Sequence, residues 1–267
     1  MRVVILGSGT SAGVPTLGCR CAVCRSDDPR NKRMRASAYI EAGGLRLLID
    51  CGPDFRTQAL ANGVEDVDFV LLTHAHADHV AGLDDLRSFN LVHKHPITLY
   101  GGDDTLADIR ERFGYCFRPP TQAGGGLPDL RLETVPPDRG QAWADGDSGD
   151  TILRALPIPV FHGKLPIFGW RLGNFAYLTD VSEVPDDSLA RLKGVDTLVT
   201  STLRHRPHPT HMSLDESVAL ARRVGARRTW FVHMCHDLDH AETNAALPPD
   251  IQLAHDGLTF TVDDDEK

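Results

Sequence analysis

The residues best suited to chemistry lie in one short segment that holds three imidazoles and one carboxylate: His74, His76, Asp78 and His79. The apolar residues 69–72 come directly before it and predict a buried strand that ends where the histidines begin. Neutral imidazole and carboxylate are groups that hold Zn²⁺, Mn²⁺ or iron in proteins. The spacing therefore predicts that His74 and His76 face one ion, and that Asp78 and His79 face another. A solvated histidine-rich loop is the alternative, and the buried strand argues against it.

Three further polar residues each follow an apolar segment of the chain. They are His162 after residues 158–161, Asp180 after residues 175–179, and His233 after residues 229–232. Taken singly, a histidine at a strand end is usually a surface residue, and an aspartate there usually caps a turn. Taken together with the cluster at 74–79, the three predict a site at one edge of a sheet.

In this order, the seven residues resemble the HxHxDH motif and the later ligands of the metallo-β-lactamase superfamily of binuclear hydrolases, over nearly the whole chain. The resemblance implies an α/β fold, the αββα four-layer sandwich, in which two mixed sheets face each other with helices outside. It implies that one metal ion is held by His74, His76 and His162. The second would be held by Asp78, His79 and His233, with Asp180 bridging the two. The implied cofactors are two divalent ions, Zn, Mn or Fe.

Three cysteines lie within six residues: Cys19, Cys21 and Cys24. The cluster is similar to one in the phosphodiesterases of the carbon–phosphorus lyase pathway, which cleave cyclic ribose phosphates. This resemblance implies a closed structural zinc held by the three cysteines and His236. Cys235 is an alternative ligand, and a redox or merely buried cysteine cluster is the alternative to zinc. We expect Cys51 and Cys116 to be ordinary buried residues.

The reaction implied by the resemblance is hydrolysis of a small phosphodiester by a hydroxide that bridges the two ions. Asp78 and His211 are the candidate catalytic residues. His211 precedes a predicted helix, as a catalytic histidine does in phosphodiesterases of this superfamily, and would protonate the leaving alkoxide. The alternative is a surface-loop histidine. Asp50 either accepts a hydrogen bond from a ligand imidazole or caps a turn, and Lys164 either contacts a substrate phosphate or is an ordinary exposed lysine.

Short apolar segments alternate with amphipathic ones and predict one layered α/β domain over residues 1–267. The predicted strands are Arg2–Leu6, Ser37–Glu41, Leu45–Asp50, Asp68–Leu72, Ile97–Tyr100, Leu130–Val135, Thr151–Val160, Gly169–Leu172, Phe175–Leu178, Thr197–Thr200, Thr229–Val232 and Leu258–Val262. The predicted helices are Asp54–Asn62, His79–Phe89, Asp104–Phe113, Asp186–Lys193, Leu214–Val224 and Ala241–Ala246. Ser213 and Glu216 form a capping-box pattern before the helix at 214. We interpret residues 117–150, rich in Gly, Pro and Asp, as loops around one strand.

Composition limits the classes of partner. The 267 residues carry 28 Lys and Arg against 37 Asp and Glu, a formal charge of −9, which disfavours binding to long nucleic acids. No apolar run approaches the roughly 20 residues that span a bilayer, and the N-terminus lacks the pattern of a signal peptide. We therefore expect a cytoplasmic protein with a small phosphodiester substrate. A homodimer is expected only from the resemblance.

Two other functions remain open at this point. The turn at residues 9–15 and the loop that bears His211 also resemble tRNA 3′-end processing endoribonucleases, although no Lys/Arg-rich arm is present. The cysteine-rich N-terminus and residues 52–56 resemble the pyrroloquinoline quinone biosynthesis protein, which suggests a non-catalytic carrier. Lactone or thioester hydrolysis is a further alternative, because the same hydroxide attacks carbonyl groups.

Overall fold

The computed structural model describes residues 1–118, 126–144 and 151–263, which form two seven-stranded sheets. The first sheet has the order β14-β1-β2-β3-β4-β5-β6. Its strands are β1 (Arg2–Gly7), β2 (Ser37–Ala42), β3 (Leu45–Ile49), β4 (Phe69–Leu71), β5 (Ile97–Gly101), β6 (Leu130–Thr134) and β14 (Thr259–Thr261). The second has the order β13-β12-β11-β10-β9-β8-β7. Its strands are β7 (Gln141–Ala144), β8 (Thr151–His162), β9 (Leu165–Leu172), β10 (Phe175–Leu178), β11 (Thr197–Ser201), β12 (Arg228–Val232) and β13 (Ile251–Leu253).

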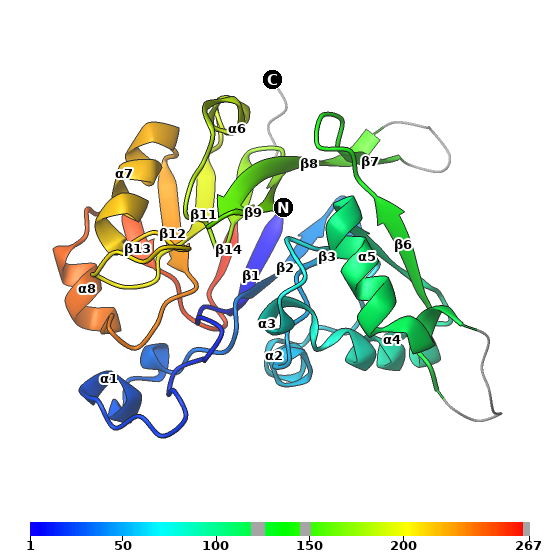
Figure 1. Cartoon of the computed structure of the whole chain (residues 1–267), viewed down its shortest axis with the longest axis horizontal. Coiled ribbons are helices and arrows are strands. Elements are labelled where there is room, and N and C mark those ends of the chain that lie inside the picture. The colour runs from blue at the N-terminus through cyan, green and yellow to red at the C-terminus, as the bar shows by residue number, and fades with distance from the viewer. Residues whose placement is uncertain (119–125, 145–150, 264–267) are drawn as a thin grey trace.

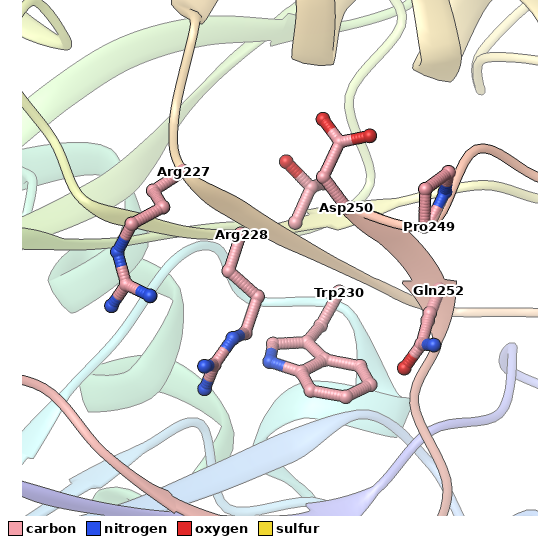
Figure 2. Close-up of a pocket in the computed structure, with 7 residues that line it drawn as sticks. Arg227, Arg228, Trp230, Pro249, Asp250 and Gln252 are labelled. Atoms are coloured by element: carbon pink, nitrogen blue, oxygen red, sulfur yellow. The ribbon is translucent and has the colours of Figure 1, made fainter.

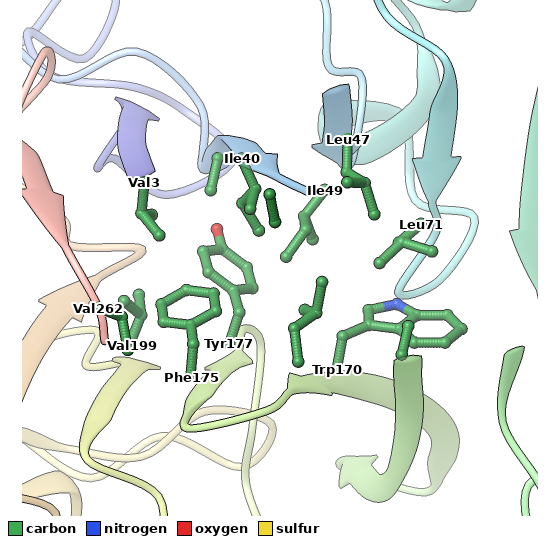
Figure 3. Packing of buried hydrophobic residues seen from close by; sticks show 14 of the residues in the cluster. Val3, Ile40, Leu47, Ile49, Leu71, Trp170, Phe175, Tyr177, Val199 and Val262 are labelled. Atoms are coloured by element: carbon green, nitrogen blue, oxygen red, sulfur yellow. The ribbon is translucent and has the colours of Figure 1, made fainter. Parts of the chain in front are cut away.

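The two sheets pack face to face through the inward side chains of their strands. Val3, Ile40 and Ile49 of the first sheet meet Trp170 and Tyr177 of the second in one buried apolar cluster (Figure 3). Successive residues of a strand point to opposite faces, so alternate residues of each strand enter this cluster. Burial of such side chains stabilises the fold by roughly 1.5–3 kcal/mol for each large one.

Helices cover the outer face of each sheet, with the strands between the two groups (Figure 1). The helices that follow strands of the first sheet are α2 (Phe55–Asn62), α3 (Ala77–Val80), α4 (Arg87–His93) and α5 (Asp103–Arg112). Those that follow strands of the second are α6 (Asp186–Arg191), α7 (Leu214–Val224) and α8 (His240–Ala246). The predicted capping box is present, because Ser213 Oγ accepts from the backbone of Glu216 while the Glu216 carboxylate accepts from Ser213. The predicted αββα sandwich is confirmed.

One predicted helix is wrong in its extent. Residues 79–89 form the end of α3, a 3₁₀ helix at Leu83–Leu86 and the start of α4, rather than one continuous helix. The break coincides with Gly82, where a Cβ would lie 2.0 Å from the carbonyl oxygen of Gly52. Close packing against the segment after β3 therefore decides the local conformation.

The segment 117–150 holds two strands, β6 and β7, and not the single strand that was predicted. Its residues 119–125 and 145–150 lie outside the described residues. The short β7 was missed because its residues, Gln-Ala-Trp-Ala, lack the β-branched character of a strand. The three-residue β13 and the short helix α1 (Ala22–Arg25) were also missed, and β9 begins four residues earlier than predicted. In the described part of the chain, no helix is long and apolar enough to cross a membrane.

Candidate metal centre

Five of the seven predicted metal ligands lie at or just after the ends of strands, and Asp78 and His79 lie in the short helix α3 that follows β4. His74 and His76 follow β4, His162 ends β8, and Asp180 and His233 follow β10 and β12. Because β10 and β12 both run parallel to β11, their carboxyl ends meet at one edge of the second sheet. Asp180 (φ 57°) and His233 (φ 58°) adopt a left-handed backbone conformation there, which is uncommon outside glycine and costs about 1–3 kcal/mol. The fold thus holds the backbone of both residues in a strained conformation at the edge of the sheet where their side chains converge.

Three histidines form the first group of converging side chains. Nε2 of His74 lies 3.0 Å from Nδ1 of His76, and the His162 ring is centred 5.7 Å from His74 and 5.2 Å from His76. Nδ1–H of His162 donates to the carbonyl oxygen of Thr210 at 2.7 Å. That bond leaves Nε2 of His162 with a free lone pair, as a metal ligand requires. The three rings therefore present nitrogen ligands to one point.

Two carboxylates and two histidines form the second group. Nε2 of His79 lies 3.2 Å from an oxygen of Asp78 and 3.2 Å from an oxygen of Asp180. Nε2 of His233 lies 3.2 Å from the other oxygen of Asp180. This same oxygen is 4.0 Å from Nε2 of His74 in the first group. Asp180 consequently stands between the two groups, in the position of a shared ligand.

The buried carboxylate of Asp50 orients the ring of His79 directly and that of His74 through Thr73. Oδ2 of Asp50 accepts from Nδ1–H of His79 at 2.7 Å and from the hydroxyl of Thr73 at 2.8 Å. The Thr73 oxygen in turn lies 3.0 Å from Nδ1 of His74. These bonds leave Nε2 free on both histidines and orient it toward the site. The hydrogen bond expected of Asp50 is present, and the part played by Thr73 was not foreseen.

Charge is concentrated around the second group. Burial lowers the pKa of His79, but the adjacent carboxylates of Asp180 and Asp50 outweigh burial and raise this pKa well above its ordinary value. Burial raises the pKa of Asp180, but His233 and His79 hold it well below its usual range. For His74, burial dominates and the pKa falls well below that of a free imidazole. The edge therefore presents the ionised carboxylate of Asp180 beside the neutral imidazole of His74, while His79 holds its proton between two carboxylates until a cation displaces it.

The residues present fit two divalent ions. In the described structure, Nε2 of His79 and both ring nitrogens of His233 are buried without a hydrogen-bond partner. Leaving such a group unpaired costs about 1–3 kcal/mol, and an ion in the site would remove that cost. The donor set of imidazole nitrogen and carboxylate oxygen suits Zn²⁺, Mn²⁺ or Fe²⁺.

A second set of possible ligands lies in the N-terminal segment. Nδ1 of His236 is 3.1 Å from Sγ of Cys19 and 3.5 Å from Sγ of both Cys21 and Cys24. Sγ of Cys21 also accepts from the backbone N–H of Cys24, and this bond lowers the pKa of the Cys21 thiol to about 6. Three sulfurs and one nitrogen around one point fit a closed zinc site.

The other cysteines lie outside this cluster. Cys235, the alternative ligand, has its sulfur accepting from the backbone of Asp237 and is not grouped with the three thiols. Cys51 is fully buried in the apolar layer between the first sheet and its helices, and Cys116 packs against that layer. These two are ordinary packing residues, as expected.

Backbone hydrogen bonds and the Arg33 side chain link the His/Asp site to the Cys₃His cluster. The buried Arg33 donates to the carbonyl oxygens of Cys235 (2.9 Å) and Leu238 (2.6 Å). The glycine-rich turn near the N-terminus pairs with the residue after His233, because Met234 N–H donates to Ser8 and Met234 accepts from Thr10. The segment 233–238 is therefore held from both sides while it carries one residue of each cluster.

Two loop histidines complete the site. The ring of His211 is centred 4.6 Å from His162 and 4.9 Å from His233, stacked on the latter at 19°. Burial, followed by the neighbouring His233, lowers the pKa of His211 to about 3. His208 lies 5.2 Å from His211 between ring centroids and was not singled out from the sequence. The signal available in the sequence was that three histidines, His205, His208 and His211, lie in the one segment between β11 and α7.

Other polar features lie outside the two ligand clusters. The cleft lined by Arg228, Trp230 and Gln252 is at the amino end of β12, opposite His233 (Figure 2). Asp66 and Asp68 are already paired with Arg46. Lys164 is exposed on the turn between β8 and β9, outside the clusters. Neither the cleft nor the acidic pair is a candidate for the same chemistry.

The chain is similar to known proteins along most of its length. Residues 45–234 match the model described as "Beta-lactamase superfamily domain". An octanoyltransferase of Porphyromonas gingivalis is 40% identical over 99% of this chain, which spans only 52% of that relative, or about half its length. Coenzyme PQQ synthesis protein B of Methylobacterium radiotolerans is 33% identical, over 98% of this chain and 100% of the relative.

Solved structures share the fold of this chain. A structure described as a new diphosphatase from the PhnP family is 41% identical with a TM-score of 0.87, over 98% of both chains. Zn²⁺-bound PqqB from Methylobacterium extorquens is 23% identical with a TM-score of 0.78, over 98% of this chain and 100% of that chain. Human tRNase Z, short form, is 19% identical with a TM-score of 0.65, over 98% of this chain and 100% of that one. The last two show a common fold.

Proposed function

The chain belongs to the metallo-β-lactamase superfamily, and from that membership we propose that it is a binuclear metal-dependent hydrolase that breaks a P–O bond in small phosphodiesters or diphosphates. The observation that carries the proposal is the position of Asp180. One of its oxygens lies within 3.2 Å of His233 and 4.0 Å of His74, so a single carboxylate reaches both groups of donors.

In this proposal, seven residues hold two ions. The first is held by His74, His76 and His162, the second by Asp78, His79 and His233, and Asp180 is shared. When bound, such a pair supplies Lewis acidity toward phosphoryl oxygens and lowers the pKa of water. The set Cys19, Cys21, Cys24 and His236 holds a structural zinc that fixes the segment after β12.

His211 is the proposed proton donor to the leaving oxygen. Its ring contacts those of His162 and His233, so it faces the space shared by the two groups. Without substrate the ring is neutral, since burial lowers its pKa to about 3 even though the Asp180 carboxylate nearby acts in the opposite direction. A phosphoryl group in contact brings negative charge, which favours the protonated ring. Such a donor contributes about 10²–10⁴-fold in rate.

The alternatives receive less support. The net charge of −9 and the missing Lys/Arg-rich arm disfavour a grip on tRNA. A non-catalytic carrier, the function suggested by similarity to the PQQ synthesis protein, would not need seven converging metal ligands. The octanoyltransferase is about twice as long as this chain, so its named activity can belong to the half that this chain lacks.

Two kinds of linkage are candidates for the bond that is cleaved. The cysteine cluster supports a phosphodiester of the cyclic ribose phosphate type. The similarity to a PhnP-family diphosphatase, at 41% identity over 98% of both chains, supports a diphosphate linkage. In both, the attacked phosphorus carries two ester or anhydride oxygens, so the same donors serve either reaction.

A substrate panel tests the proposal. Protein loaded with Mn²⁺ or with Zn²⁺ is assayed on bis(p-nitrophenyl) phosphate, p-nitrophenyl phosphate, a 2′,3′-cyclic nucleotide, a nucleoside diphosphate sugar and a lactone. We expect diesters or the diphosphate to be cleaved at least tenfold faster than the monoester, with loss of turnover in Asp180→Ala. Hydrolysis of the lactone alone, or of nothing at all, would contradict it.

A further inference from the structure

We propose that His208 and Lys164 form a subsite for a second phosphoryl group, beside the one that is hydrolysed, so that a diphosphate is preferred over a simple diester. The inference rests on the proposed function, because it places the first phosphoryl group among the metal ligands. It assigns roles to two residues that lie outside those ligand clusters.

The orientation of His208 is fixed by its own loop. The backbone N–H of Thr210 donates to Nδ1 of His208 at 3.3 Å, and the Thr210 hydroxyl lies 3.2 Å from the same nitrogen. Because Nδ1 accepts a hydrogen bond, the proton of the neutral ring is on Nε2. In the described part of the chain, this Nε2–H has no partner. His208 therefore presents one fixed, uncommitted donor.

The His208 ring lies next to the proposed reaction site. The ring of His208 is centred 5.2 Å from that of His211, which contacts the ligand candidates His162 and His233. Thr210, which orients His208, also accepts the hydrogen bond of His162 through its carbonyl oxygen. Thr210 thus orients two imidazole rings, that of the ligand candidate His162 and that of His208.

The β8–β9 turn, which packs on the same loop, carries a positive charge. A Cβ on Gly163 would lie 2.8 Å from Cγ2 of Thr210, so the turn packs closely on the His208 loop. Lys164 follows Gly163, is exposed and makes no hydrogen bond or ion pair with the residues described. In a chain with a net charge of −9, this ammonium is an unpaired positive charge only two residues after the ligand candidate His162.

The neighbouring charged groups leave this subsite positive. The Arg204 guanidinium lies along the loop, donating to the carbonyl oxygens of Arg206 and Pro207. Asp237, a carboxylate beside the loop, is paired with Arg206 at 3.4 Å. An ammonium and an imidazole N–H suit a compact anion, and a diphosphate carries more negative charge than a diester. A second phosphoryl group is therefore the chemistry that fits.

Binding of inert analogues tests the subsite separately from turnover. Isothermal titration of the Mn²⁺-loaded protein with adenosine 5′-(α,β-methylene)diphosphate and with AMP gives the ratio of their dissociation constants. The variants are His208→Asn, His208→Gln and Lys164→Met, with His205→Asn as the matched control from the same loop. Asparagine can replace Nδ1 as acceptor but loses the outward donor, whereas glutamine places an N–H near the position of Nε2.

We expect the wild type and His205→Asn to bind the diphosphate analogue more tightly than AMP. His208→Asn should reduce that preference about tenfold and Lys164→Met several-fold, the scale of one hydrogen bond to a charged group. His208→Gln should restore most of it. An equal ratio in His208→Asn and His205→Asn, or no preference in the wild type, would overturn the subsite. Lys164→Met, an exposed change, keeps the test valid if a His208 variant fails to fold.

Kinetics separates this proposal from the proposed function. The ratio of kcat/KM for a nucleoside diphosphate sugar to that for bis(p-nitrophenyl) phosphate should fall about tenfold in His208→Asn, mainly through KM. If the wild type cleaved neither compound, the proposed function would be wrong, while the binding ratio would still decide whether the subsite exists.

Discussion

Nδ1 of His79 donates to Oδ2 of Asp50 at 2.7 Å, and both side chains are fully buried. The bond directs the other nitrogen of His79 toward Asp180 and Asp78, 3.2 Å away in each case. Asp50 thus decides which atom of His79 faces the site, and it also anchors Thr73. Its own left-handed backbone conformation (φ 58°) is one that asparagine tolerates.

Asp50→Asn should therefore fold but bind metal more weakly. An amide offers one acceptor oxygen where the carboxylate offers two, and it is neutral. We expect affinity for Zn²⁺ or Mn²⁺ to fall about 10–100-fold, as for other partners of metal-bound histidines. Competition with a chromogenic chelator measures it. Asp68→Asn, which alters a carboxylate paired with Arg46 outside the site, is the control. Unchanged affinity in Asp50→Asn would show that the Asp50 carboxylate does not support metal binding by His79.

His211→Ala should lower turnover without emptying the site. The His211 ring stacks on that of His233, but in the proposed function it donates a proton and does not bind metal. We expect kcat to fall about 10²–10⁴-fold with the metal content unchanged. His205→Ala, an exposed histidine of the same loop, should keep full activity. Wild-type turnover by a metal-replete His211→Ala protein would remove His211 from the mechanism.

His236→Ala should remove one zinc per chain and lower stability. Its Nδ1 is the nitrogen around which the three thiols gather, and the segment it belongs to also carries His233. We expect the metal pair to stay filled and Tm to fall by roughly 10 °C, corresponding to a few kcal/mol. Elemental analysis and calorimetry measure both effects. Cys235→Ser should keep the full zinc count, and retention of that count in His236→Ala would contradict the Cys₃His assignment.

Asp256 should make stability depend on pH. Its buried carboxylate accepts from Ser8 and Met34, and burial raises its pKa to about 6. The folded chain therefore binds a proton more tightly than the unfolded chain, where the pKa is about 3.9. This contribution to the free energy of unfolding is complete below about pH 4 and is lost as pH rises through about 6.

The Asp256→Asn variant isolates that effect. The free energy of unfolding of the wild type minus that of Asp256→Asn should decrease by about 2 kcal/mol from pH 4 to pH 7. Urea unfolding at several pH values measures it, and the difference cancels the titration of the other groups. A difference that is constant over this range would show that the pKa of Asp256 is not raised.

Sequence patterns predicted the ligand candidates because each follows an apolar strand, and parallel strands bring such positions to one edge. His162, Asp180 and His233 were found in this way. Features that depend on contacts distant in sequence were not found. The break at Gly82 arises from the approach of Gly52, and the orientation of His208 arises from a bond with Thr210. Hydrophobic periodicity carries no information on such contacts.

The central claim is that Asp180 joins two groups of donors around a pair of divalent ions. Anomalous scattering from a crystal grown with Zn²⁺ or Mn²⁺, recorded on both sides of the metal's absorption edge, tests it most directly. The account predicts two peaks about 3.5–4 Å apart with the Asp180 carboxylate between them, one beside His74 and the other beside His233. A single peak, or none in metal-rich buffer, would contradict it.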